Sequence, residues 1–142
     1  MDLPVDNLTA ATIDAAFAGN RLLATLSAEE RAHLEPHVEI VELEAGAPVM
    51  TAGQNVTRSL FPFDGLIISL QIEMAGSRSV EVASIGMEGA AGGIVSCGSA
   101  PAFAHALVQL GGRAAAVPMA VLEEAKAASP HVKNLFCRYS DA

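Results

Sequence analysis

Most of the residues that could contact a ligand lie in one glycine-rich stretch, Ile85 to Gly93, which reads IGMEGAAGG. It holds four glycines, two alanines and a single carboxylate, Glu88. Glycines allow backbone N–H groups to approach an anion, and the start of a helix favours negative charge, so this composition suits a phosphate-binding loop. It suits a tight turn between a strand and a helix equally well.

The histidines and cysteines give weaker signals. His33 and His37 have the i, i+4 spacing of a helical zinc pair, but a proline at position 36 breaks the helix between them. Cys97 and Cys137 are 40 positions apart without C-x-x-C spacing, and we interpret both as free thiols. A cysteine nucleophile needs a base and an orienting group, and no sequence feature places His105 beside Cys97. We therefore predict neither a metal site nor a catalytic site.

Length and charge restrict the function further. A chain of 142 residues is expected to form one domain, and 51% hydrophobic against 17% charged residues favour a packed core over disorder. The net charge is −8 and the eight basic residues are scattered along the sequence. Because binding to the phosphate backbone depends on lysine and arginine, we do not expect this chain to bind nucleic acid by itself. No apolar run is long enough to span a membrane, and the N-terminus lacks the basic and apolar regions of a signal peptide. We expect a cytoplasmic protein that contacts no membrane.

Helical signals occur on both sides of a central region. The segment 20–33 is predicted to open as a helix, and Ser27 followed by Glu30 fits a capping box, in which each side chain binds the other residue's backbone N–H. A second helical region runs from 119 to 129, and a further helix is predicted to begin after Pro130.

Between these helical regions the apolar pattern changes to a period of two. Each apolar segment is short and is bounded by Gly, Pro or Asn, which is typical of an all-β sandwich or barrel. The predicted strands are 38–44, 49–53, 59–63, 66–74, 77–85, 105–110 and 113–118. Ala75-Gly76 and Gly111-Gly112 are candidate hairpin turns.

This order of elements, together with the segments FPFDGLIISL (61–70) and VEVASIGMEGAAG (80–92), resembles the sensor domain of bacterial Crp/Fnr-type transcription regulators. The resemblance covers roughly residues 20 to 138 and points to the branch that carries a G-x-E-G-x-x-G loop. It implies a mainly β fold with flanking helices, the cyclic-nucleotide-binding-domain-like β-roll, which is a form of jelly roll. In the family, a long dimerisation helix and a DNA-binding helix-turn-helix follow the β-roll.

The resemblance also implies a domain organisation. Residues 1–19 would be an N-terminal extension, 20–130 the β-roll sensor domain, and 131–142 the start of the C-terminal dimerisation helix. The helix-turn-helix does not fit in this sequence, so we expect DNA contacts only through a domain absent from this chain, and a homodimer in the full-length protein. The sequence is compatible with a fragment of a longer regulator and with a short protein that lacks the DNA-reading half.

Family members that bind cyclic AMP use a phosphate-binding cassette at the position of the glycine-rich stretch. The cassette's ribose-binding Glu falls on Ile94 here, its phosphate-binding Arg falls near Ala104, and His105 takes the place of a small polar residue. No arginine occurs between Arg78 and Arg113. Because one missing charge-assisted hydrogen bond costs about 1.5–3 kcal/mol, an anionic ligand would depend on backbone amides. The candidate ligand-binding residues are Gly86, Glu88, Gly89, Ala90, Ala91, Gly92, Gly93, Ile94, Ser96, Ala104 and His105.

We therefore expect a sensor domain, not an enzyme, that binds a small effector in the β-roll and passes the signal through the C-terminal helix. Cyclic AMP and cyclic GMP are candidate effectors, but the Glu and the Arg of the family motif are missing, which favours a different small ligand or none. The alternative is a stand-alone β-roll interaction module that has lost both cyclic-nucleotide and DNA binding.

Overall fold

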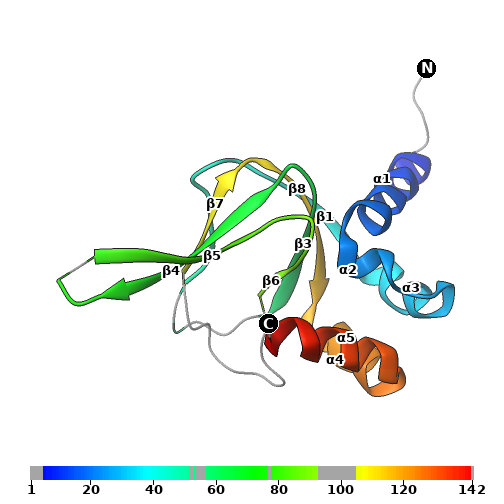
Figure 1. Ribbon diagram of the computed structural model, residues 1–142. Helices are drawn as coiled ribbons and strands as arrows, with labels where there is room; N and C mark the ends of the chain where they lie inside the picture. Colours follow the sequence, from blue (N-terminus) through cyan, green and yellow to red (C-terminus); the bar gives the residue numbers. More distant parts are fainter. Residues whose placement is uncertain (1–4, 52, 54–56, 77, 93–104, 142) are drawn as a thin grey trace.

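The structure, a computed structural model, describes residues 5–51, 53, 57–76, 78–92 and 105–141, with the backbone alone for 5–9 and 136–141. Within these residues, two four-stranded antiparallel sheets pack face to face, and the helices lie to one side of them (Figure 1). The helices are α1 (Val5–Gly19), α2 (Arg21–Ala24), α3 (Ala28–Leu34), the 3-10 turn η1 (Glu35–His37), α4 (Met119–Ala128) and α5 (Pro130–Asp141). The strands are β1 (Glu39–Leu43), β2 (Pro48–Met50), β3 (Arg58–Asp64), β4 (Ile67–Met74), β5 (Arg78–Ile85), β6 (Ala91–Gly92), β7 (His105–Leu110) and β8 (Gly112–Pro118).

One sheet, with strand order β1-β8-β3-β6, forms the middle layer of the molecule. Because side chains alternate along a strand, its two faces belong to two different cores. Phe61 and Val117 pack against the helices, whereas their neighbours Leu60 and Ala116 pack against the second sheet, β2-β7-β4-β5. This is the β-roll with flanking helices that the resemblance implied, and the mainly β prediction is confirmed.

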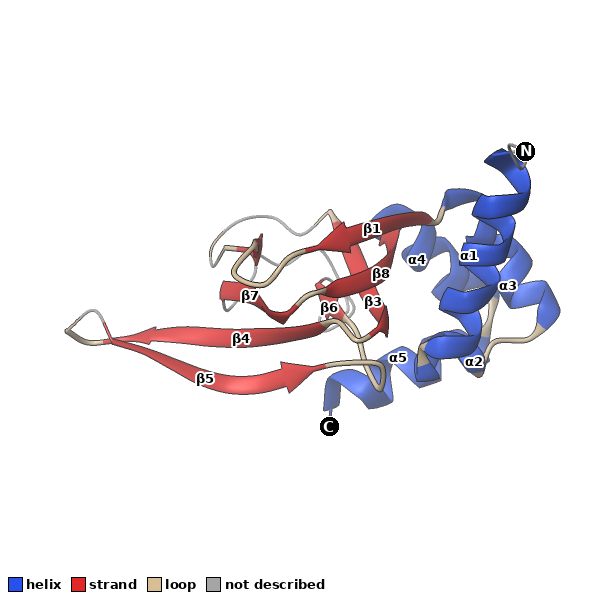
Figure 2. Cartoon of the chain, turned by 90° about the horizontal axis from the view of Figure 1, so that it is seen from above, coloured by secondary structure: helices blue, strands red, loops and turns tan. Residues whose placement is uncertain are grey.

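The strand predictions hold for every segment that was named. The predicted strands correspond to β1, β2, β3, β4, β5, β7 and β8, with small differences at their ends. The prediction missed β6, which consists of Ala91 and Gly92 inside the glycine-rich stretch. Ala75-Gly76 joins β4 to β5 as predicted, and this hairpin extends well beyond the other strands (Figure 2).

The predicted hairpin at Gly111-Gly112 is wrong. Strand β7 pairs with β2 and β4, whereas β8 pairs with β1 and β3, so the two glycines carry the chain from one sheet to the other. A Cβ atom at Gly112 would lie 2.5 Å from the Leu66 nitrogen and would also contact the Asp64 carbonyl. Gly112 is needed because the crossing passes directly over the β3–β4 turn, and not because a hairpin requires it.

The helical core begins before residue 20. Ile13, Ala16 and Phe17 of α1 are buried in the same core as Phe61, although the sequence suggested an extension for residues 1–19. Arg31 of α3 stacks over the Phe17 ring with its guanidinium carbon 4.5 Å from the ring centre. This segment therefore contributes to the domain's own packing.

The segment 20–33 forms two short helices. The capping box is confirmed: Glu30 N–H donates to Ser27 Oγ over 3.1 Å, and Ser27 N–H donates to the Glu30 carboxylate over 2.8 Å. Since Ser27 has the extended backbone of an N-cap, it separates α2 from α3. Leu22 and Leu23 before it are buried.

Candidate ligand-binding site

The first half of the glycine-rich stretch is a turn closed by its own hydrogen bonds. Ile85 ends β5 with a buried side chain, and the Gly89 N–H donates to the Gly86 carbonyl over 3.2 Å. The exposed Glu88 side chain bends back and accepts a hydrogen bond of 3.0 Å from the Gly86 N–H. Two of the amides that could have faced an anion are therefore engaged by the protein itself.

The carbonyl groups of the same turn are bound by the start of α2. The Met87 carbonyl accepts a hydrogen bond of 2.8 Å from the Arg21 N–H, and the Gly89 carbonyl accepts one of 2.8 Å from the Asn20 side-chain amide. The same amide donates to the Pro62 carbonyl on β3 over 2.9 Å. The turn is thus hydrogen-bonded to the start of α2, and Asn20 connects it to the middle sheet.

Asn20 satisfies all of its hydrogen-bonding groups in this position. Its side chain is fully buried, and its Oδ1 accepts hydrogen bonds from the backbone N–H groups of Leu22 and Leu23 as the N-cap of α2. The sequence contained a signal for this cap, because an Asn directly precedes an apolar helical segment. It contained no signal for the two bonds to distant carbonyls, and Asn20 is not among the residues predicted for the site.

The second half of the stretch enters the middle sheet. Ala91 and Gly92 form β6 and lie opposite Leu60 and Ser59 of β3. Gly92 has a φ of 114°, and a Cβ atom there would lie 2.5 Å from the Arg58 carbonyl. A glycine is required at this position because β6 approaches β3 so closely.

His105 lies at the other end of the segment, at the start of β7. It is opposite Gln71 of β4, and its Nε2 atom is 3.5 Å from a Glu73 carboxylate oxygen. The side chain is 29% exposed, so it remains accessible. The other candidates, Gly93, Ile94, Ser96 and Ala104, lie outside the described residues.

The segment 86–105 itself carries no lysine or arginine, although Arg58 lies next to Ser59, the β3 residue opposite Gly92. The chain has no arginine between Arg78 and Arg113 and no lysine before Lys126. Among the described residues, no three His, Cys, Asp or Glu side chains are grouped so that they could hold a metal ion. No helix in the same residues is long and apolar enough to cross a membrane. A ligand here would be held by backbone groups, by hydroxyl or imidazole groups and by apolar contacts.

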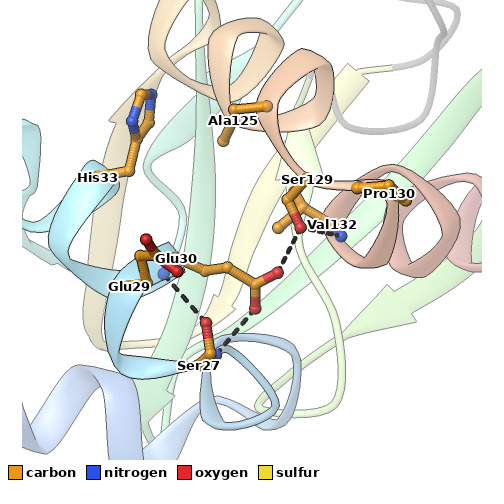
Figure 3. Close-up of a pocket in the computed structure, with 9 residues that line it drawn as sticks. Ser27, Glu29, Glu30, His33, Ala125, Ser129, Pro130 and Val132 are labelled. Carbon is orange, nitrogen blue, oxygen red and sulfur yellow. Dashed lines mark hydrogen bonds between the residues drawn. The ribbon is translucent and has the colours of Figure 1, made fainter.

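A second polar cluster joins α3 to the junction of α4 and α5. The Glu30 carboxylate accepts a hydrogen bond from the Ser129 hydroxyl (Figure 3). It also lies 3.0 Å from His131 Nδ1. Its side chain is only 12% exposed. These contacts lower the pKa of Glu30 from its usual 4.5 to about 2, chiefly through the Ser129 hydroxyl, then through the Ser27 N–H and His131.

Acidification is expected to remove this contribution of Glu30 to stability. The carboxylate has a lower pKa in the folded chain than in the unfolded chain, so its stabilising effect is complete above pH 4.5 and disappears as the pH falls toward 2. Urea unfolding of the wild type and of Glu30→Ala measures this. The difference in unfolding free energy should be greatest above pH 4.5 and should shrink between pH 4.5 and 2. A difference that stays constant over that range would contradict the assignment.

The outer face of the second sheet carries a separate groove of about 320 Å³. Its lining includes Ser69, Gln71 and Glu81, and the Ser69 hydroxyl donates to the Glu81 carboxylate over 2.7 Å. None of these residues is among the candidates predicted from the sequence. The groove is a competing location against which ligand binding at the glycine-rich segment can be tested.

Several solved structures with this arrangement are regulatory or sensor domains. The N-terminal domain of a transcriptional regulator from Streptomyces coelicolor has a TM-score of 0.67 and 20% identity, covering 87% of this chain and 86% of that one. The sensor domain of the transcriptional regulator DNR from Pseudomonas aeruginosa has a TM-score of 0.70 and 10% identity over 89% and 84% of the two chains. The regulatory domain of Toxoplasma gondii PKA, solved with cAMP, has a TM-score of 0.76 and 13% identity over 95% and 51%.

The chain has the fold of a cyclic-nucleotide-binding domain. This confirms the fold that the resemblance to Crp/Fnr-type sensor domains implied. The chain spans about half the length of the PKA regulatory domain, whereas it spans most of the two bacterial domains. No family model and no curated protein matches the sequence.

Proposed function

We propose that this chain is the ligand-sensing domain of a Crp/Fnr-like transcription regulator, with the effector bound at the segment 86–105 and no catalytic role. One observation carries the proposal most directly. The turn that precedes the segment 93–104 is hydrogen-bonded to α2 through Asn20 and Arg21, so a ligand that moves this segment also acts on the helical layer. The two bacterial structures that share the fold, both from transcriptional regulators, support the same role.

The candidate residues divide into two groups under this proposal. The residues from Gly86 to Gly92 support the site and do not contact the ligand, because several of their polar backbone groups are hydrogen-bonded within the protein. Ligand contacts then come from Gly93, Ile94, Ser96, Ala104 and His105. Because the segment itself supplies no cation, a cyclic nucleotide bound by it alone would lose about 1.5–3 kcal/mol for each missing charge-assisted hydrogen bond. An effector with little or no negative charge suits this composition better than a cyclic nucleotide does.

The signal leaves through the C-terminal helix. A ligand that binds one arrangement of α5 more tightly than another shifts the population toward that arrangement, whereas equal affinity for both would shift nothing. In a homodimer of a longer protein, a reoriented α5 would in turn reorient the DNA-reading domains.

Calorimetric titration of the purified chain with millimolar cyclic AMP and cyclic GMP, followed by a metabolite panel, tests the proposal. We expect saturable binding of at least one compound, and no saturable heat from any of them would favour the stand-alone interaction module instead.

His105 provides a residue-level prediction. His105→Ala is expected to weaken binding of the identified compound by about tenfold, the effect of losing one hydrogen bond in a partly buried site. His37→Ala, which removes an exposed histidine from η1 on the helical side, is the matched control and should leave the dissociation constant unchanged. Equal effects of the two substitutions, measured by the same titration, would exclude His105 as a contact.

A further inference from the structure

We propose that residues 20–30 form a link between the glycine-rich turn and the start of α5, with Asn20 and Glu30 as the positioning residues at its two ends. The biological meaning of this link rests on the proposed sensor function, because the link would connect the segment 86–105 to α5, the C-terminal helix. The link itself is a property of the folded chain without ligand.

The first end of the link is Asn20. Its buried side chain and the neighbouring Arg21 N–H bind two carbonyl groups of the turn, those of Gly89 and Met87. The bond from Asn20 to Gly89 connects residues 69 positions apart along the chain. A displacement of the turn therefore acts directly on the first residues of α2.

The segment between the two ends is short and internally bonded. The Ala24 N–H donates to the Asn20 carbonyl and the Leu26 N–H donates to the Leu23 carbonyl, which takes the chain to Ser27. There the capping box joins Ser27 to Glu30 through two reciprocal hydrogen bonds. Since no long loop interrupts these bonds, the segment is suited to move as one unit.

The second end of the link is Glu30, which reaches the α4–α5 junction. Its carboxylate binds the Ser129 hydroxyl (Figure 3) and lies 3.0 Å from Nδ1 of His131, in the first turn of α5. Ser129 is extended between the two helices, and its hydroxyl also accepts from the Val132 N–H at 3.3 Å, so it caps α5. A single carboxylate on α3 thus hydrogen-bonds to Ser129, the residue that caps α5.

The surroundings of this contact leave room for a second arrangement. A cavity of about 380 Å³ lies between α3 and the junction, and its lining includes Glu29, His33 and Ala128 together with Glu30 and Ser129. Helices that meet at one extended residue can pivot there when the contact that holds that residue is lost. Other titratable groups around the junction include Glu29, His33, Glu124, His131 and Lys133. His33 Nε2 lies 3.8 Å from the Glu124 carboxylate.

Amide hydrogen exchange of the ligand-free, ¹⁵N-labelled chain tests the link. The reporters are the N–H groups of Val132 and Lys133, which bind the Ser129 hydroxyl and carbonyl, and the reference is the Val108 N–H in the sheets. Asn20→Ser keeps an N-cap oxygen but is too short to reach the Gly89 carbonyl. We expect it to speed exchange at the two reporters by about tenfold relative to the reference, a typical coupling between sites.

The second substitution, Glu30→Asp, keeps the charge and shortens the reach to Ser129. It should also speed exchange at Val132 and Lys133, and the Asn20→Ser/Glu30→Asp double variant should match Glu30→Asp alone because the link is already broken. Glu29→Asp, on the same turn of α3 and beside the same cavity, is the matched control and should change neither reporter. The Arg31 N–H, bound to the Ser27 carbonyl, shows in each variant whether α3 remains intact.

Unchanged reporters in Asn20→Ser, or additive effects in the double variant, would overturn the link. If Asn20→Ser does not fold, Glu88→Ala disturbs the same turn from its exposed side, and the same reporters should respond. The ligand titrations give an independent result. Coupled exchange without any bound effector would contradict the sensor function alone, whereas effector binding with uncoupled exchange would contradict the link alone.

Discussion

Replacement of Asn20 by alanine is expected to lower the free energy of unfolding by about 3–7 kcal/mol. The substitution removes an N-cap, worth about 1 kcal/mol, and leaves two buried carbonyl groups without their donor at about 1–3 kcal/mol each. Those carbonyls belong to Pro62 and Gly89, so the loss affects the middle sheet and the glycine-rich turn together. Urea or guanidinium unfolding measures the change directly. For a domain whose whole stability is about 5–15 kcal/mol, this is a large fraction.

Two further variants separate the parts of this effect. Asn20→Ser retains the cap, and should therefore be less destabilising than Asn20→Ala by about 1 kcal/mol. Asn134→Ala removes an exposed asparagine from α5 and should change the stability by less than about 0.5 kcal/mol. If Asn20→Ala stayed within that same narrow range, the bonds of Asn20 to the two carbonyls would contribute nothing measurable.

The second large effect is expected at Gly92. In Gly92→Ala the new methyl group would lie 2.5 Å from the Arg58 carbonyl, and the residue would have to keep a φ of 114°. Relief requires β6 to separate from β3, so we expect a destabilisation of about 3 kcal/mol and a fall in Tm on the order of 10 °C. Thermal unfolding followed by circular dichroism measures it.

Gly76→Ala is the matched control for Gly92. Gly76 has a φ of 84° in the β4–β5 turn, but a methyl group added there would meet no atom within 4 Å, so only the backbone cost of about 1 kcal/mol applies. Similar losses of stability in Gly92→Ala and Gly76→Ala would mean that the contact of the new methyl group with β3 destabilises the protein very little. The comparison also bears on ligand tests, because lost binding in a Gly92 variant would reflect damage to the sheet as well as to any anion cradle.

The sequence predicted the elements well where a local pattern specifies them. Alternating apolar residues located seven strands, and Ser27 with Glu30 predicted a capping box that the structure contains. Strand β6 was not predicted because its two small residues, Ala91 and Gly92, show no alternation of apolar and polar side chains. Gly111-Gly112 was assigned to a hairpin because turn residues indicate where a chain bends, but not which sheet it joins next.

The candidate site was only partly predictable for the same reason. The composition of IGMEGAAGG was compatible with a phosphate loop and with a structural turn, and the structure gives its first half the hydrogen bonds of a turn. That outcome depends on Asn20 and Arg21, which are more than sixty positions away in the sequence. The contact of Glu30 with Ser129 is equally distant, at 99 positions. Pairings of this kind are set by tertiary packing, and no local pattern of residues encodes them.

The central claim is that an effector binds at the segment 86–105, and chemical-shift mapping with the compound that gives the largest calorimetric heat tests it most directly. We predict saturable changes in the amide signals from Ala90 to His105, together with smaller changes in α2, whose first residues bind the turn. Saturable changes confined to the groove of Ser69, Gln71 and Glu81, with the glycine-rich segment unaffected, would contradict the claim and place the ligand on the outer face of the second sheet.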